Sequence, residues 1–393
     1  MTIVLTGGGS GGHITPILAV AHELKNQSPD TRIVYIGQKG DKLIEVIDSS
    51  EHVDEIHAIR AGKFRRYHNE GLRQWLSLKT WWLNLRDSLF VLVGIWQSWR
   101  LLKKLNAKAV FVKGGYVGLP VGLAAGLRRI PYVTHDSDSV PGLTNRTIAK
   151  RASYHAVAMP VEVYKYPKSK TVFTGVPIVR EYKKVTPRSR QEYRRGLGIP
   201  TDAKVITVTG GGLGAEQLNQ AVVKISKQLF NQYPNLFLVH LAGSKHDKSV
   251  LDLYAKELTN EQRKRLMVKG FINDLYRYSA AADLVITRAG ATALAEFALQ
   301  ECACVVVPNP ALTGGHQTKN AKILADKQAI KLIDENMLKS NPGLLYTAIR
   351  GLLDFSEKRF ELARRLGSYA KPQAASELAK LILSVVRGEK SAI

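Results

Sequence analysis

Cysteine and acidic residues are scarce in this chain. Two cysteines in 393 residues exclude a disulfide framework and favour a reducing compartment. Asp and Glu number 33 against 57 Lys and Arg, which gives a formal net charge of +24. The longest uncharged run of membrane-like composition, residues 88–99, is too short to span a bilayer. Because the first residues enter a strand pattern at once, we expect no signal peptide.

The two cysteines do not indicate a metal site. Cys302 and Cys304 lie in an apolar run over 302–307 that reads as a buried strand, and no further Cys or His cluster accompanies them in the sequence. The apolar content of 45% is that of a globular protein. A chain of this length is long for a single hydrophobic core, so the sequence predicts two domains.

The positive charge is concentrated in one segment. Residues 60–129 contain 14 Lys or Arg and only two acids, Glu70 and Asp87, and they also hold all five tryptophans (Trp75, Trp81, Trp82, Trp96 and Trp99). Basic residues interleaved with Trp and Leu suit a surface helix among anionic lipid headgroups. A core helix pair with basic outer faces is the alternative. A nucleic-acid surface is a third reading, but no nucleic-acid motif accompanies the charge. We predict a peripheral contact with an anionic membrane and no nucleic-acid partner.

A seven-residue glycine loop occurs twice. Residues 6–12 and 209–215 are identical at five of seven positions, and each loop leaves a β-branched strand and enters a helical pattern. Glycine permits close backbone approach, and the following helix N-terminus offers free N–H groups to an anion. Two such loops in corresponding positions predict an α/β fold with two Rossmann-like parallel-sheet domains that face one cleft.

Strand patterns alternate with helical ones along both halves. The strands expected in the first half are 3–5, 32–36, 109–112, 132–134, 154–158 and 171–173, and the segment 160–187, which includes the last of them, is the candidate linker. Those expected in the second half are 205–208, 236–240, 267–269, 284–287, 305–308 and 329–332, and the tail over 342–386 reads as helical throughout.

Candidate catalytic groups in the first half follow glycine turns and strands. His13 comes directly after the first glycine loop, where the positive helix end lowers the pKa of the imidazole and favours a neutral base; a histidine that only caps the helix is the alternative. Asp136 and Asp138 follow the strand 132–134 as Asp-x-Asp, a pair able to hold a divalent ion. Two such carboxylates are more often a helix cap and a hydrogen-bonding group, so we expect no metal.

In the second half, a helix opening at Ala291 offers free backbone N–H groups to phosphate or sugar oxygens. Glu296 lies one and a half turns further on and suits two ribose hydroxyls, with a solvated surface glutamate as the alternative. Gln317 and Asn320 share one helical face and carry amides suited to sugar hydroxyls.

Taken together, the motifs at 7–13, 135–145, 210–215, 271–274, 288–296 and 317–321 resemble the MurG family of glycosyltransferases. That family transfers N-acetylglucosamine from UDP-N-acetylglucosamine (UDP-GlcNAc) to a lipid-linked N-acetylmuramoyl-pentapeptide in peptidoglycan synthesis. The resemblance implies the GT-B fold, with an acceptor- and membrane-binding domain over 1–176, a UDP-sugar-binding domain over 177–366 and a C-terminal helix over 367–393 that packs back on the first domain. It also implies that the first domain carries an apolar patch with a basic rim, which binds the cytoplasmic face of the cell membrane.

The resemblance assigns roles residue by residue. His13, helped by Asp138, would be the catalytic base, and no cofactor or metal is required. The residues that it implies for substrate binding are Ser10, Gly11 and Gly12 on the acceptor side, and Arg180, Gly212, Ile272 (uracil), Ala291, Thr292, Glu296 (ribose), Gln317 and Asn320.

Several positions depart from the family pattern. His135 to Asp138 read His-Asp-Ser-Asp instead of His-Glu-Gln-Asn, Gly212 and Leu213 replace a Ser-Gln pair, and Arg180 is displaced by one place. Two alternatives therefore stay open: transfer to another membrane lipid, and a non-catalytic UDP-sugar-binding homologue. A dinucleotide-dependent oxidoreductase is disfavoured, because Ile36 is followed by Gly-Gln-Lys rather than by an acidic residue.

Overall fold

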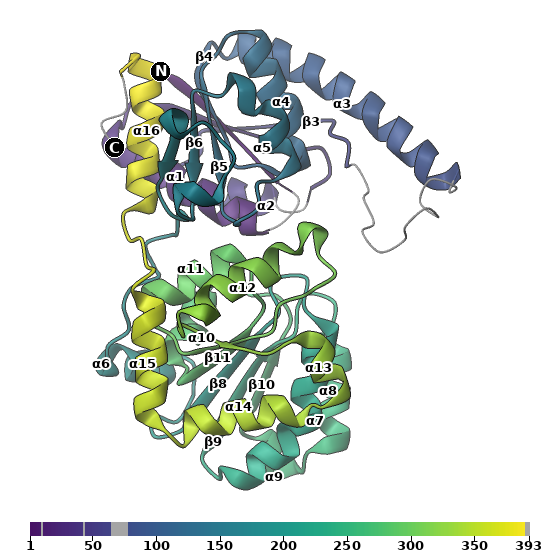
Figure 1. Ribbon diagram of the computed structural model, residues 1–393, viewed down its shortest axis with the longest axis vertical. Helices are drawn as coiled ribbons and strands as arrows, with labels where there is room; N and C mark the ends of the chain where they lie inside the picture. Colours follow the sequence, from purple (N-terminus) through teal and green to yellow (C-terminus); the bar gives the residue numbers. More distant parts are fainter. Residues whose placement is uncertain (9–10, 42–43, 64–77, 390–393) are drawn as a thin grey trace. The chain divides into compact units, whose positions relative to one another are not determined.

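The computed structural model describes residues 1–8, 11–41, 44–63 and 78–389. The chain forms two compact units, each described here by itself: Met1–Arg180 with Lys371–Ile393, and Glu181–Ala370 (Figure 1). The chain thus passes between units after Arg180 and after Ala370, whereas the resemblance placed these points after 176 and 366.

The first unit contains a seven-stranded parallel sheet. Its strand order is β3-β2-β1-β4-β5-β6-β7. The strands are β1 (Thr2–Thr6), β2 (Arg32–Gln38), β3 (Glu55–Ile59), β4 (Ala107–Val112), β5 (Tyr132–Asp136), β6 (Tyr154–Val157) and β7 (Thr171–Phe173). The central strands are buried on both faces, which explains their continuous apolar runs. The edge strand β3 was missed, because its residues alternate in polarity and are only partly buried.

Helices cover both faces of this sheet. They are α1 (Gly11–Gln27), α2 (Ile44–Asp48), α3 (Leu78–Lys104), α4 (Gly115–Leu127), α5 (Leu143–Ile148) and α16 (Ala374–Arg387), with short 3-10 turns at Ala149–Arg151, Val161–Val163 and Lys168–Lys170. Figure 1 shows α16 beside α1, although the two helices lie at opposite ends of the sequence. Leu378 and Ile382 of α16 belong to the same core cluster as Ile17 and Val20 of α1. The C-terminal helix therefore completes the core of the first unit.

The second unit repeats this architecture with six parallel strands in the order β10-β9-β8-β11-β12-β13. The strands are β8 (Lys204–Thr209), β9 (Leu236–Leu241), β10 (Leu266–Lys269), β11 (Leu284–Thr287), β12 (Cys304–Val306) and β13 (Lys331–Leu332). Two parallel-sheet α/β domains confirm the predicted fold class.

The helices of the second unit are α6 (Pro187–Gly196), α7 (Glu216–Gln232), α8 (Asp247–Glu257), α9 (Asn260–Arg263), α10 (Leu275–Ala281), α11 (Ala291–Gln300), α12 (His316–Asp326), α13 (Glu335–Ser340), α14 (Gly343–Leu353) and α15 (Ser356–Gly367), with a 3-10 turn at Thr313–Gly315. The prediction of an uninterrupted helical tail was wrong. The tail breaks between α14 and α15 and again over 368–373, where Pro372 lacks the N–H that a helix interior requires.

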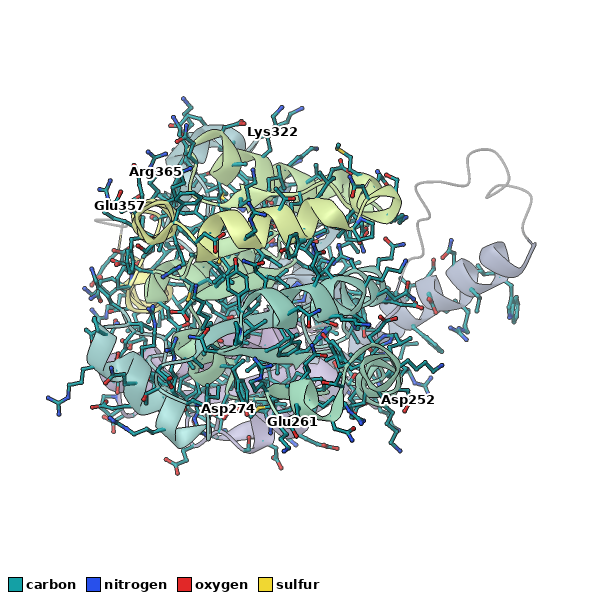
Figure 2. All side chains as sticks on the ribbon, turned by 90° about the horizontal axis from the view of Figure 1, so that it is seen from below. Asp252, Glu261, Asp274, Lys322, Glu357 and Arg365 are labelled. Atoms are coloured by element: carbon teal, nitrogen blue, oxygen red, sulfur yellow. The ribbon has the colours of Figure 1, made fainter. Side chains whose placement is uncertain are left out.

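Charged side chains lie on the outside of the second unit. Figure 2 shows Glu357 and Arg365 on α15, Lys322 on α12 and Asp252 on α8 at its periphery. The apolar faces of these elements form two core clusters, one on each side of the sheet. The buried ionisable groups described below are therefore exceptions that need a physical reason.

Each sheet has one topological switch point, where the chain starts to add strands on the opposite side. It lies between β1 and β4 in the first unit and between β8 and β11 in the second. Ligands of open α/β sheets bind outside the carboxyl ends of the strands at this point. The two glycine loops follow β1 and β8, and both switch points therefore carry the motifs found in the sequence.

Candidate functional site

His13 lies in the first turn of α1, beside the switch point of the first unit. The side chain is half-buried and hydrogen-bonds to the backbone of Gly8. Burial and the nearby charge of Lys113 lower the pKa of His13 to about 3, against a smaller raising effect of the Gly8 hydrogen bond. The imidazole is thus neutral, in the expected direction. Burial is the larger cause of this shift, and Lys113, which the sequence did not link to His13, is the second.

Lys113 follows β4 directly and is only 3% exposed. Its Nζ donates a hydrogen bond to Ser137 Oγ at 2.9 Å. Burial lowers the pKa of Lys113 to about 8, and the charges of Asp136 and Asp138 partly oppose this shift. Sequence reasoning counted Lys113 only as part of the basic segment. A lysine at the end of a buried parallel strand was the signal that could have identified it, because a buried cation needs partners.

The two carboxylates in the loop after β5, Asp136 and Asp138, have different surroundings. Asp136 is buried, and its oxygens accept hydrogen bonds from the Gly142 N–H at 3.0 Å and the Tyr166 hydroxyl at 2.8 Å. Burial raises the pKa of Asp136, and these hydrogen bonds oppose the increase. Asp136 thus anchors the turn that begins α5, while Asp138 is more exposed. Within the described ranges, no group of three or more His, Cys, Asp or Glu side chains could hold a metal ion.

Four further residues predicted to bind substrate have different outcomes. Ser10 lies outside the described residues, and Gly11 and Gly12 form the start of α1. Arg180 is largely exposed and donates to Glu23 on α1 at 2.7 Å. Its substrate-binding role stays a prediction.

Glu296 on α11 is buried, with 7% of the residue exposed. Burial raises the pKa of Glu296 to about 8, and a hydrogen bond from Tyr182 opposes the increase. The reading of Glu296 as a solvated surface glutamate is therefore wrong. Tyr182, which sequence reasoning missed, also lies edge-on to the ring of Tyr276 at 6.0 Å between centroids.

The start of α12 is hydrogen-bonded to the loop that precedes it and to the segment that precedes α11. Gln317 Oε1 accepts from the Asn309 N–H at 2.9 Å, and buried Asn320 donates to the Ala289 carbonyl at 3.5 Å. Gly290 has no side chain to cap α11, and the helix begins at Ala291 and Thr292 at the end where a helix interacts favourably with an anion. Ala291 is buried and Thr292 is half-buried.

The second glycine loop approaches two other segments closely. Gly214 has φ +81°, and a Cβ there would lie 2.3 Å from the Ala242 carbonyl oxygen, so only glycine fits. Gly212 is exposed, and a Cβ on it would lie 3.1 Å from the Phe271 ring, next to half-buried Ile272. Leu213 is 77% exposed and offers no polar group. The fold thus brings Gly212 and Ile272 to the same region.

Arg288, at the end of β11, is a buried cation with structural partners. It pairs with Glu335 of α13 and donates to the Val307 carbonyl at 3.0 Å. This ion pair fixes the segment that leads from β11 into α11. Neither Glu335 nor its pairing with Arg288 was predicted, because the two residues are 47 positions apart and nothing local links them.

The chain is similar to known proteins over nearly its whole length. Residues 3–157 match the glycosyltransferase family 28 N-terminal domain, and residues 205–381 match the C-terminal domain of the same family. A protein of Natranaerobius thermophilus named UDP-N-acetylglucosamine--N-acetylmuramyl-(pentapeptide) pyrophosphoryl-undecaprenol N-acetylglucosamine transferase is 32% identical over 98% of this chain and 100% of its own. A Bacillus cereus protein of the same name, numbered 1, is 30% identical over 98% and 100%.

Comparison with solved structures agrees with these sequence matches. The crystal structure of Acinetobacter baumannii MurG is 26% identical, with a TM-score of 0.70 over 98% of this chain and 99% of its own. The UDP-GlcNAc 2-epimerase of Neisseria meningitidis, at 13% identity and a TM-score of 0.64 over 99% and 100%, shares the fold alone. Two matched domains and full-length relatives at this identity show that the chain belongs to glycosyltransferase family 28.

Proposed function

We propose that this protein transfers N-acetylglucosamine from UDP-GlcNAc to a lipid-linked N-acetylmuramoyl-pentapeptide, with inversion at the anomeric carbon. The full-length relatives bear the name of this activity. The observation that carries the donor side is a buried carboxylate, Glu296, on a helix that begins directly after a glycine turn. A ribose presents two vicinal hydroxyls to such a carboxylate, and a diphosphate presents oxygens to the helix N-terminus.

The second unit holds the donor in this proposal. Glu296 accepts both ribose hydroxyls, and the Ile272 backbone contacts uracil. The N–H groups of the Gly212 loop and of Ala291 and Thr292 meet the diphosphate, and they also stabilise the charge that UDP gains as it leaves. Gln317 and Asn320 face the sugar; the bond from Asn309 occupies Gln317 Oε1 and leaves Nε2 to donate. The Leu213 side chain has no polar group, so only the backbone of its loop contacts the diphosphate.

The first unit holds the acceptor. Neutral His13 takes the proton of the attacking hydroxyl, a bond forms between that oxygen and the anomeric carbon, and the bond from this carbon to the UDP oxygen breaks. Asp138 assists His13, and Ser10, Gly11 and Gly12 contact the acceptor. Arg180 would have to exchange Glu23 for substrate. A positioned general base contributes about 10²–10⁴-fold to a rate.

The experiment is release of UDP from UDP-GlcNAc, measured with and without a short-chain muramoyl-pentapeptide lipid. We expect release only with the acceptor, and a loss of about 10²-fold or more in His13→Gln. His57→Gln, on edge strand β3, is the matched control and should keep wild-type turnover. A folded His13→Gln variant with near-wild-type turnover would remove the base assignment.

The departures at Ser137 and Asp138 motivate a second acceptor class, such as diacylglycerol. Turnover on diacylglycerol that exceeds turnover on the muramoyl lipid would replace the proposed acceptor and keep the fold and donor. UDP binding without turnover on either lipid would favour a non-catalytic homologue.

We also propose that α3 lies on an anionic membrane surface at the cytoplasmic face of the cell membrane. One face of α3, which includes Val91, Ser98 and Leu102, is buried against its own unit. The opposite face exposes an apolar stripe with alternating spacings of three and four residues: Trp82, Leu85, Leu89, Leu92, Trp96 and Trp99. Trp75 lies outside the described residues, as does the side chain of Trp81.

Cations accompany the stripe. The guanidinium carbons of Arg100 and Arg128 lie 4.8 Å from the ring centroids of Trp96 and Trp99. An apolar face with a basic rim complements a surface of anionic lipids. In the part of the chain that the structure describes, no helix is long and apolar enough to cross a membrane. A helix lying in the interface is thus the mode of contact proposed.

Co-sedimentation with vesicles of 30% phosphatidylglycerol tests the membrane contact. We expect binding that weakens with salt, and a loss of at least about tenfold in Leu85→Gln/Leu89→Gln/Leu92→Gln, because each exposed leucine contributes on the order of 1 kcal/mol when buried in lipid. Leu251→Gln, at an exposed leucine of α8, is the control. Binding indifferent to salt and to the triple variant would leave the stripe to a protein partner.

A further inference from the structure

Lys113 occupies the switch point of the first unit. β4 pairs with β1, and the Lys113 N–H donates to the Thr6 carbonyl at 2.9 Å. Its Cβ lies against the first glycine loop, 3.0 Å from where a Cβ on Gly7 would be. The side chain is therefore placed at the start of the acceptor-side loop, and yet no acceptor-side motif in the sequence includes it.

The surroundings of the ammonium are charged and buried. Its hydrogen-bond partner is Ser137 Oγ, and the carboxylates that act on it are Asp136 and Asp138. Two imidazoles, those of His13 and His135, lie within reach of its charge: burial lowers the pKa of both, and the charge of Lys113 lowers it further. His135 is fully buried, with Nε2 at 2.8 Å from the Gly175 carbonyl oxygen.

The residues that interact with Lys113 lie together in the loop after β5. Ser137 receives the hydrogen bond of Lys113, and Asp138 supplies a negative charge. This loop and the lysine therefore form one electrostatic network.

A cation at this position offsets the free-energy cost of burying a carboxylate in the loop. Asp136 is buried, and its oxygens are held by Gly142 and Tyr166, which carry no charge. A buried carboxylate without a counter-charge is unfavourable and tends to take up a proton. The ammonium of Lys113 supplies that counter-charge and donates a hydrogen bond to Ser137, the residue that follows Asp136.

We propose that Lys113 is a positioning residue for the acceptor: its ammonium holds loop 136–138 through Ser137 and the two flanking carboxylates, so that Asp138 is kept in place beside the acceptor hydroxyl. The inference rests on the proposed function, in which the first unit takes the acceptor. Lys113 acts here as a cation and hydrogen-bond donor, and it does not exchange a proton with the substrate.

Steady-state kinetics of Lys113→Met and Lys113→Arg test this role. We expect Lys113→Met to raise the KM for the acceptor about tenfold or more, as for loss of a charge-assisted hydrogen bond, and to leave the dissociation constant of UDP unchanged. Lys113→Arg keeps the charge and should restore most of the acceptor affinity. Lys108→Met, at an exposed lysine on the same strand, is the matched control and should behave as wild type.

The pH dependence separates a cation from a base. Because the pKa of Lys113 is about 8, the wild-type KM for the acceptor should rise above that pH, and in Lys113→Arg the rise should move to higher pH. A rate that instead increases through pH 8 and is lost in both variants would overturn the inference, because Lys113 would then act as a neutral base. An unchanged acceptor KM in folded Lys113→Met would overturn it too.

Two further measurements keep the test decisive. If Lys113→Met does not fold, Ser137→Ala removes the acceptor of the Lys113 hydrogen bond, and it should raise the acceptor KM without altering UDP binding. Lysine ¹³Cε NMR of the full chain should show one resonance that titrates near pH 8 and is absent from Lys113→Arg; a Lys113 resonance that is already neutral at pH 7 would overturn the inference. Because this readout needs no turnover, failure of the proposed reaction is distinguishable from failure of the role of Lys113.

Discussion

Replacing Glu296 by glutamine should stabilise the second unit while it weakens donor binding. In the folded protein, burial raises the pKa of this carboxyl from 4.5 to about 8. In an unfolded chain the carboxyl releases its proton near pH 4.5. Between pH 4.5 and pH 8, the folded state therefore keeps a proton that the unfolded state has lost. The stability contributed is fully present below about pH 4.5 and is lost as the pH rises towards 8. Glutamine keeps the shape and cannot ionise.

The size of the effect follows from that pKa difference. At about 1.36 kcal/mol per pH unit, the roughly 3.5 units between 4.5 and 8 correspond to about 5 kcal/mol. Between pH 5 and pH 8.5, wild type should therefore lose about 4 kcal/mol more unfolding free energy than Glu296→Gln does. Other ionisable groups are common to both proteins, so their contributions cancel in this difference.

The chain offers a reporter for each unit. Both cysteines, Cys302 and Cys304, are buried in the second unit, whereas all five tryptophans belong to the first. Pulse labelling of thiols with methyl methanethiosulfonate across a urea series thus follows opening of the second unit, and tryptophan fluorescence follows the first. Glu261→Gln, at an exposed glutamate of α9, is the control and should track wild type at every pH.

One outcome would refute the reasoning. If wild type and Glu296→Gln differ by the same unfolding free energy at pH 5 and pH 8.5, the carboxyl of Glu296 is not destabilised by burial. A pH-dependent difference in the tryptophan signal alone would place the effect in the first unit and contradict the assignment equally.

Three further predictions concern the second unit. Gly211→Ala should cost about 1 kcal/mol, because its φ of +84° is strained for alanine but the space is open; Gly214→Ala adds a clash with a carbonyl oxygen and should cost a further ~1–3 kcal/mol in urea unfolding. Glu335→Ala should cost about 3–5 kcal/mol by leaving Arg288 buried and unpaired, and Arg288→Met should recover part of this loss in the double variant. UDP should bind more tightly at pH 8.5 than at pH 6.5, as Glu296 ionises, and calorimetry of Glu296→Gln should show weak binding without this dependence.

Strand and loop positions were largely predictable because their signals are local. A central strand of a parallel sheet is buried on both faces, so it reads as a short apolar run at any place in the chain. Twelve of the thirteen observed strands overlap those runs, and the exception, β3, is a partly buried edge strand. Two breaks in the C-terminal tail were missed: one lies between α14 and α15, and the other, over 368–373, contains Pro372 and coincides with the passage between the units after Ala370.

The candidate site was predictable to the extent that its residues belong to compact motifs. His13 and Glu296 were singled out by their distance from a glycine turn and a helix start, and the structure places each beside the switch point of its own sheet. Their ionisation could not be read in the same way. The pKa of His13 depends on Lys113, one hundred positions away, and that of Glu296 on the burial of α11.

The sequence by itself determined the family, the two parallel-sheet domains and the glycine loops, since these depend on patterns within a few neighbouring residues. Only the tertiary structure decided which partner each buried ionisable group meets: Ser137 for Lys113, Tyr182 for Glu296, and Arg288 for Glu335. Such pairs join strands and helices that are distant in the chain. They exist because strand order and register bring those elements together, and burial then makes each unpaired charge costly enough to need its partner.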